Sequence, residues 1–170
     1  MKICGIVGWK NSGKTFFARK LISYFTNQKF NVASIKHAHH DFDIDKPNTD
    51  SFLHRQAGSQ QVIISSSKRW AKISELNKSN EKTLYELIDE LNMADIIIVE
   101  GFKNEKHAKI EIIKDDSDPS THLFPHLKNV IGIVADSKFS IDIFFNKLIT
   151  SFFVKGCLFI SMYFVKYNQQ

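Results

Sequence analysis

The chain has 170 residues, a length that fits one domain with a single sizeable core. It is 43% hydrophobic and 24% charged, and its formal net charge of +5 mildly favours anionic partners such as nucleotides or acidic protein surfaces. Basic residues form no dense run, so nucleic acid is a weaker candidate partner. No apolar stretch reaches the roughly 18 residues of a membrane-spanning helix. The two cysteines, Cys4 and Cys157, lie far apart without zinc-type spacing, and we expect a cytoplasmic protein.

The hydrophobic pattern predicts strands and helices that alternate along the chain. In chain order we expect a strand at 3–7, a helix at 14–27, a strand at 31–36, a helix at 48–58, a strand at 61–65, a helix at 81–92, and strands at 95–100, 109–113 and 129–135. This alternation predicts an α/β fold with a mostly parallel central sheet between helices. We expect the polar loop at 115–126 to be exposed.

A glycine-rich loop follows the first predicted strand. Residues 8–15, Gly-Trp-Lys-Asn-Ser-Gly-Lys-Thr, fit G-x-x-x-x-G-K-[ST] at every fixed position, between an apolar strand and an amphipathic helix. Such a loop turns backbone N–H groups and a helix N-terminus toward phosphate, its lysine reaches the β- and γ-phosphates, and its threonine hydroxyl binds Mg²⁺. The candidate phosphate-binding residues are Gly8, Asn11, Ser12, Gly13, Lys14, Thr15 and Phe16. The sequence therefore predicts a three-layer phosphate-loop NTPase fold, and we interpret Lys10 as a surface lysine.

An acid closes the most apolar predicted strand. Glu100 ends the run at 95–100, and Gly101 follows it. Ligands of open α/β sheets bind beyond the carboxyl ends of the strands, where a second carboxylate can hold Mg²⁺ beside the phosphate loop. Glu100 is thus a candidate catalytic and metal-side residue together with Thr15, although it could instead cap a turn. Asp95, at the start of the strand, is expected to be structural.

Histidines and acids gather after the strand at 31–36. Residues 36–45 read Lys-His-Ala-His-His-Asp-Phe-Asp-Ile-Asp. Three interpretations are open: a transition-metal site, a loop at Mg²⁺ and the attacking water with Asp41 as catalytic candidate, or a polar loop that contacts a partner. Arg55, further along, could reach an anion or be an ordinary helix arginine.

Several segments occur together in a specific order. They are Gly8 to Thr15, Ile35 to Pro47, Asp50-Ser51, Arg55 with Ala57-Gly58, Arg69-Trp70-Ala71, Val99 to Lys103, Ala108 to Glu111, and the strand ending Ala135-Asp136. In this combination the chain resembles the bacterial molybdopterin-guanine dinucleotide biosynthesis adapter family (MobB), from residue 1 to about residue 136.

The resemblance implies a GTP-binding, Mg²⁺-dependent homodimer with weak GTP hydrolysis. Members of the family assist the guanylyltransferase MobA, which attaches GMP to molybdopterin. Guanine preference does not follow from the residues, because the Asn-Lys-x-Asp signature of other GTPases is absent; Asp136 is a candidate substitute. The alternatives are a small-molecule kinase, against which the presence of only three arginines argues, and a metal-delivery GTPase, which the histidines favour.

The chain also departs from the family pattern. Asn48 stands after Pro47 where the family usually has glycine, and asparagine tolerates the left-handed backbone that such a turn requires. We expect one domain over residues 1–170 with an atypical end at 137–170. Its apolar residues at 144–165 could complete the core, enter a dimer contact or form an exposed patch.

Overall fold

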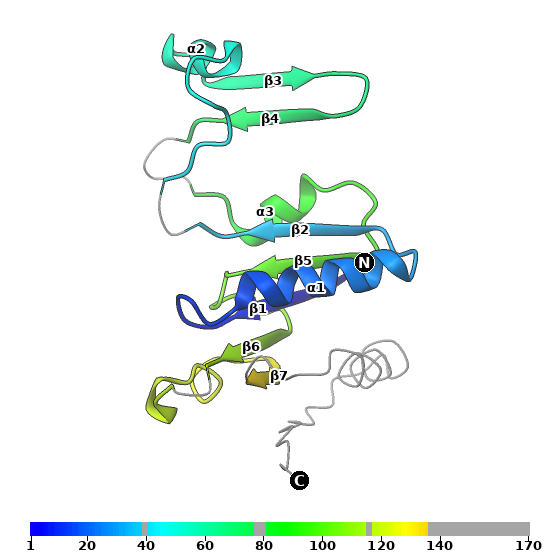
Figure 1. The fold of residues 1–170 in the computed structure, drawn as a ribbon, viewed down its shortest axis with the longest axis vertical. Helices are drawn as coiled ribbons and strands as arrows, with labels where there is room; N and C mark the ends of the chain where they lie inside the picture. Colours follow the sequence, from blue (N-terminus) through cyan, green and yellow to red (C-terminus); the bar gives the residue numbers. More distant parts are fainter. Residues whose placement is uncertain (39–40, 77–80, 115–116, 136–170) are drawn as a thin grey trace. The chain divides into compact units, whose positions relative to one another are not determined.

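The computed structural model describes residues 1–38, 41–76, 81–114 and 117–135. The described chain divides into two compact units, which we treat separately (Figure 1). The first unit contains residues 1–37 and the described residues from 90 onward, and the second contains residues 38–89.

A five-stranded parallel sheet forms the first unit. Its strands are β1 (Lys2–Val7), β2 (Val32–Lys36), β5 (Ile96–Glu100), β6 (Lys109–Ile113) and β7 (Val130–Ala135). They lie in the order β2-β5-β1-β6-β7, and every neighbouring pair is parallel. All five strands therefore end at the same edge of the sheet. The predicted α/β fold with a mostly parallel central sheet is confirmed.

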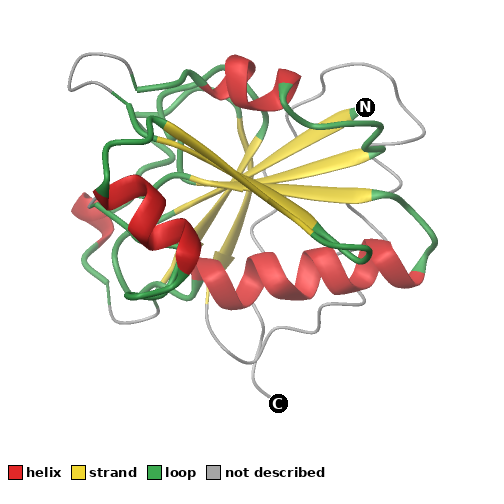
Figure 2. Ribbon diagram, turned by 90° about the horizontal axis from the view of Figure 1, so that it is seen from above, coloured by secondary structure: helices red, strands yellow, loops and turns green. Residues whose placement is uncertain are grey.

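The long helix α1 (Lys14–Asn27) runs along one side of this sheet (Figure 2). Phe17, Leu21 and Phe25 recur every four residues, so they share one helix face, and all three are buried. They belong to one core cluster with β1, β5, β6 and β7 side chains. In β5, residues 96–99 are buried without alternation, as expected for a central parallel strand covered on both faces. Cys4 is buried in the same core.

Asp95 joins the strand starts at the other edge of the sheet. Its carboxylate accepts the backbone N–H of Asn31 at 2.8 Å, and its carbonyl accepts the N–H of Lys2 at 2.8 Å. The residue thus ties β2, β5 and β1 together, which supports the structural role expected for it.

The second unit contains a β-hairpin and two short helices, α2 (Asp50–Gln56) and α3 (Leu84–Asp89). The hairpin pairs β3 (Gln61–Ser65) with β4 (Trp70–Ser74) in antiparallel register. Residues 61–65 form the expected strand, but it pairs with β4 and is not part of the parallel sheet. The missing element was β4, whose residues are mostly exposed and therefore carry a weak apolar pattern. The hydroxyl of Ser66 accepts the N–H groups of Lys68 and Arg69 and fixes the turn between the strands.

Local signals set the ends of the two helices. Gly58 has φ +102° and follows α2, where the N–H groups of Gly58 and Ser59 return to the carbonyls of Arg55 and His54 in a Schellman pattern. Asn48 has φ +66°, the left-handed conformation that the sequence indicated asparagine could adopt at this turn. None of the helices in the described ranges has the length and apolarity that crossing a membrane requires.

Candidate functional site

The loop from Gly8 to Thr15 leaves β1 at the carboxyl edge of the sheet. Three of its residues have left-handed φ values: Gly8 at +148°, Asn11 at +62° and Gly13 at +94°. A Cβ at Gly8 would collide with the backbone carbonyl of Ile112 on β6. Glycine is therefore required at this position by both conformation and space.

The loop presents polar groups that the protein itself leaves without partners. No side chain caps the first turn of α1, so the N-terminal N–H groups of the helix lack a side-chain acceptor. The Ser12 hydroxyl is buried and has no hydrogen-bond partner within the described residues. Donors of this kind, together with the positive end of the helix dipole, favour an anion such as phosphate.

Lys14 lies half-buried at the start of α1. Its ammonium donates a 2.6 Å hydrogen bond to the carbonyl of Trp9, across the loop. Burial lowers the pKa of Lys14; the nearby Glu100 carboxylate opposes this shift and Lys36 adds to it. Two lysines and one carboxylate therefore lie close enough to influence one another.

Glu100 contacts side chains from both the phosphate loop and β2. Its carboxylate oxygen Oε1 accepts a 2.9 Å hydrogen bond from the Thr15 hydroxyl and lies 3.5 Å from the Lys36 ammonium. The parallel register explains this meeting, because Glu100 pairs with Ile6 of β1 on one side and with Lys36 of β2 on the other. A hydroxyl and a carboxylate side by side are the hard oxygen donors that suit Mg²⁺.

The strand ends around Glu100 pack closely. Gly101 has φ +101°, and a Cβ there would lie 2.7 Å from the Cβ of His37. The His37 ring stacks on Phe102 with centroids 4.4 Å apart, and the His37 N–H donates to the Glu100 carbonyl at 2.8 Å. Gly101 thus lets the ends of β2 and β5 approach each other beside the site.

A buried acid fixes the loop after β6 beside the phosphate loop. Glu111 is 1% exposed, and its two carboxylate oxygens accept the N–H groups of Leu123 and Phe124, each at 2.7 Å. The indole N–H of Trp9 donates to the carbonyl of Thr121 at 2.6 Å. In the loop that was expected to be exposed, residues 118–121, 125 and 126 are exposed, whereas Leu123 and Phe124 are partly buried and anchored. Sequence reasoning missed this role of Glu111; the signal was an acid inside an apolar strand.

Phe16 and Asp41, two further residues predicted for the site, are both exposed. Phe16 is 61% exposed, and its ring contacts the ammonium of Lys20. Asp41 is an exposed residue of the second unit. Asp136, His39 and His40 lie outside the described residues.

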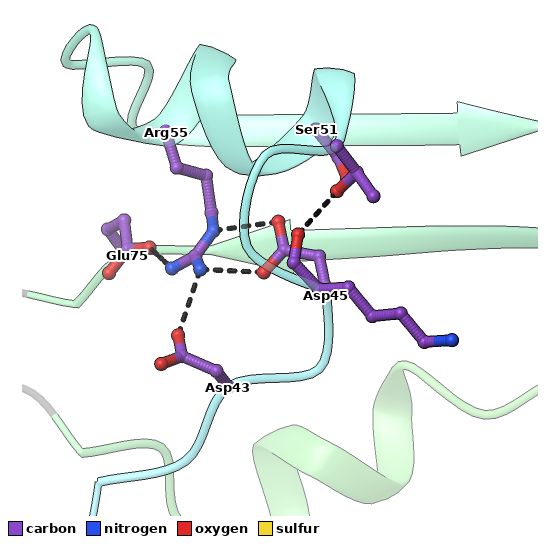
Figure 3. A network of polar contacts seen from close by, with 7 residues as sticks. Asp43, Asp45, Ser51, Arg55 and Glu75 are labelled. Carbon is purple, nitrogen blue, oxygen red and sulfur yellow. Dashed lines mark hydrogen bonds and ion pairs between the residues drawn. The ribbon is translucent and has the colours of Figure 1, made fainter.

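In the second unit, Arg55 binds the acids that follow β2 (Figure 3). Its guanidinium contacts Asp45 at 2.6 Å, Asp43 at 2.9 Å and Glu75 at 2.6 Å. The Arg55 and Asp45 side chains are only 12% and 5% exposed. Two of the three acids proposed for a metal or catalytic loop thus bind an arginine, and no group of three or more metal-type side chains occurs within the described ranges.

The fold and the loop together define a class of protein. A parallel sheet whose first strand runs into the Gly8–Thr15 loop, with a carboxylate at the end of the adjacent strand, is the arrangement of phosphate-loop nucleotide-binding proteins. A family model described as molybdopterin guanine dinucleotide synthesis protein B (MobB) matches residues 3–136, and the chain belongs to this family. The resemblance inferred from the sequence is confirmed.

Known proteins agree with this membership. The Escherichia coli molybdopterin-guanine dinucleotide biosynthesis adapter protein is 34% identical over 143 residues, which cover 83% of this chain and 82% of that protein. The Haemophilus influenzae protein of the same name is 37% identical over 108 residues, covering 64% of this chain and 61% of that protein.

Solved structures share the fold. Bacillus subtilis MobB has a TM-score of 0.64 at 23% identity, with 81% of this chain and 82% of that chain covered. A MobB homologue from Bacillus stearothermophilus has a TM-score of 0.63 at 19% identity, with 89% and 97% covered.

Proposed function

We propose that the chain is a GTP-binding adapter in the biosynthesis of molybdopterin guanine dinucleotide. The observation that carries the proposal is the Thr15–Glu100 pair, 2.9 Å apart at the mouth of a phosphate loop, in a chain that belongs to this family. The related proteins of E. coli and H. influenzae are named as adapters of this pathway.

The residues of the phosphate loop have separate roles in this proposal. Backbone N–H groups of the loop and of the α1 N-terminus bind phosphate oxygens, the Ser12 hydroxyl gains a partner, and Lys14 leaves the Trp9 carbonyl for the phosphates. Thr15 and Glu100 would hold Mg²⁺, which, when bound, neutralises charge on the β- and γ-phosphates. Glu100 is also the catalytic candidate for weak hydrolysis, with Asp41 as the second candidate.

The nucleoside end of the ligand would lie toward β6 and β7. These strands flank β1 on the side away from Glu100, since the sheet order is β2-β5-β1-β6-β7. Asp136 directly follows β7 and remains our candidate for reading guanine.

The partner in this proposal is the guanylyltransferase MobA, which transfers GMP to molybdopterin. An adapter that binds the same nucleotide as MobA could deliver GTP to MobA. It could also stabilise the complex of MobA with molybdopterin. We expect GTP hydrolysis to be slow, because an adapter acts through binding of the nucleotide and not through its turnover.

The β3–β4 hairpin supports the homodimer. Ile63 and Trp70 are 67% and 65% exposed, and the antiparallel register places both side chains on one face of the hairpin. Exposed apolar side chains on a two-stranded sheet favour burial against a second copy. Ile63→Lys should give a monomer in sedimentation equilibrium, while Lys68→Ala, at an exposed position in the turn between the two strands, should leave the dimer intact.

A small-molecule kinase is disfavoured by the arginines. A kinase lid closes over the phosphates with several arginines, and this chain has only Arg19, Arg55 and Arg69. Arg55 is already bound to three carboxylates. The test of the whole proposal is calorimetric competition between GTP and ATP, with and without Mg²⁺. We expect GTP to bind more tightly and Mg²⁺ to strengthen binding; an ATP preference with phosphate transfer to a small molecule would reject the adapter role.

The biological role has its own test. The gene should restore molybdopterin guanine dinucleotide formation in E. coli cells that lack their adapter protein, and the Lys14→Ala form should restore less. Full restoration by Lys14→Ala would separate the adapter role from nucleotide binding.

A further inference from the structure

Lys36 lies next to Glu100, and none of the roles proposed above accounts for it. It ends β2, pairs in register with Glu100, and places its ammonium 3.5 Å from Glu100 Oε1. The same oxygen accepts the hydrogen bond of Thr15 at 2.9 Å. Lys36 therefore stands where a cation neutralises the carboxylate in the nucleotide-free protein.

The Lys36 side chain is free to leave this position. It is 63% exposed, whereas the Glu100 side chain is 12% exposed and held between two strands. A long, exposed ammonium changes rotamer at little cost, while the carboxylate stays in place. Thr15 and Glu100 would hold a Mg²⁺ ion whose charge would replace that of Lys36 beside the Glu100 carboxylate, so the ammonium would be available to another anion.

The sheet order decides which phosphate lies within its reach. Strand β5 separates β2 from β1, so Lys36 approaches from the side of Glu100 and not from that of the phosphate-loop backbone. A metal ion held by Thr15 and Glu100 would neutralise the terminal phosphates, so a cation beside Glu100 would lie near the γ-phosphate.

The charge balance also favours a second cation. A nucleoside triphosphate with Mg²⁺ has a net charge of about −2, and Glu100 adds another negative charge. Lys14 offsets only one of these charges. A diphosphate brings less negative charge and has no γ-phosphate on the side from which Lys36 approaches.

We propose that Lys36 is the residue that distinguishes triphosphate from diphosphate: it pairs with Glu100 in the nucleotide-free protein and moves to the terminal phosphate when Mg²⁺ takes its place. This inference rests on the proposed nucleotide binding and adds a specificity residue to the same site.

The test is calorimetric titration of the full chain with GTP and with GDP, in excess Mg²⁺ at constant ionic strength. Lys36→Met keeps most of the apolar stem and removes the charge. It should weaken GTP binding about tenfold, the effect of one charge-assisted hydrogen bond, and leave GDP binding within about twofold. Lys36→Arg should keep most of the GTP preference. Lys2→Met, at the opposite end of β1, removes the same charge and should change neither affinity.

Two results would overturn the inference. An equal loss for GTP and GDP in Lys36→Met would make Lys36 a general source of positive charge, and unchanged binding of both would leave it only the ion pair with Glu100. Wild-type protein that binds neither nucleotide would instead reject the proposed function itself, and the inference with it. Circular dichroism melting of each variant establishes that the exposed substitution leaves the fold intact.

Discussion

The Thr15 hydroxyl and the Glu100 carboxylate are hydrogen-bonded at 2.9 Å although they stand 85 positions apart in the chain. The contact forms because β5 lies beside β1 with Glu100 opposite Ile6, and both strands end at the same edge. The two side chains bring two oxygen donors of the kind that Mg²⁺ prefers to one place. The metal site that we propose beside the phosphate loop rests on this pairing.

Glu100→Gln should weaken Mg²⁺-dependent GTP hydrolysis more than GTP binding. The amide keeps the size and can still accept from Thr15, but it lacks the charge that attracts Mg²⁺. Single-turnover hydrolysis and calorimetry, each measured across a Mg²⁺ series, separate the two effects. Equal losses, or none, would count against Glu100 as the metal-side acid, and Glu105→Gln, after the turn beyond β5, is the matched control.

Lys14→Ala should lose most of the affinity for GTP while the fold survives. The ammonium forms one hydrogen bond, to the Trp9 carbonyl, so its removal leaves few polar groups without a partner. The loss should be about 2–3 kcal/mol, or roughly 30- to 150-fold in Kd. Lys10→Ala, in the same loop and exposed, should bind GTP nearly as the wild type does. Unchanged GTP binding by Lys14→Ala would reject the phosphate-site assignment.

The phosphate loop and Glu100 could be predicted because each carries a local pattern. The spacing of Gly8 and Gly13 before Lys14 is typical of phosphate loops and uncommon elsewhere. An apolar run that ends in an acid indicates a central parallel strand. The rule that ligands bind at the carboxyl ends of such strands then places the acid near the loop. Lys36 could not be assigned in this way, because its contact with Glu100 depends on which strand neighbours β5.

Some contacts of charged side chains leave no pattern in the sequence, because their partners are backbone groups or come from several segments. Glu111 binds two backbone N–H groups, which any residues could supply at positions 123 and 124. Arg55 collects acids from residues 43 to 75, and only the fold brings them together. Strand β3 was predicted, but its pairing with β4 was not, because the hydrophobic pattern of a strand does not indicate which strand pairs with it.

Glu111→Gln should loosen the loop after β6. Each carboxylate oxygen accepts one N–H group, and glutamine replaces one of these oxygens with an N–H₂ donor, so one backbone N–H loses its acceptor. The cost should be about 2 kcal/mol in the free energy of unfolding, measured with urea. Hydrogen exchange should rise at Leu123 and Phe124 and stay unchanged at Ser120, whose N–H donates to Asp118 within the loop. Unchanged exchange at all three amides would show that Glu111 does not hold the loop.

His107 should make the protein less stable in mild acid. The residue is buried, and burial, followed by the charge of Lys109, lowers its pKa from 6.5 to about 4. Between these values the unfolded chain binds a proton that the folded chain does not, so stability is full above pH 6.5 and falls as pH drops toward 4. The loss from this group should reach about 3 kcal/mol.

The measurement is the free energy of unfolding in urea at a series of pH values. In His107→Leu, which cannot titrate, the slope between pH 6.5 and pH 4 should be smaller by the His107 contribution. His126→Leu, at an exposed position after β6, is the matched control for the substitution itself. Equal slopes for wild type and His107→Leu would place the proton acceptors elsewhere.

Arg55→Ala should raise the pKa of the Asp45 carboxyl toward its ordinary value of 3.8. In the wild type the hydrogen bond from Arg55 is the largest cause that lowers this pKa, ahead of burial, which opposes it. A lowered carboxyl pKa contributes stability that is present above the unfolded value and is lost as pH falls through the folded value, so the variant should lose this acid-sensitive contribution. Carboxyl carbon NMR titration reports the shift directly. Asp118, whose pKa is lowered by its own bonds to Ser120, is an internal reference, and Arg69→Ala is the matched arginine control. If the pKa of Asp45 is unchanged in Arg55→Ala, the hydrogen bonds from Ser51 and the backbone, and not the guanidinium, lower this pKa.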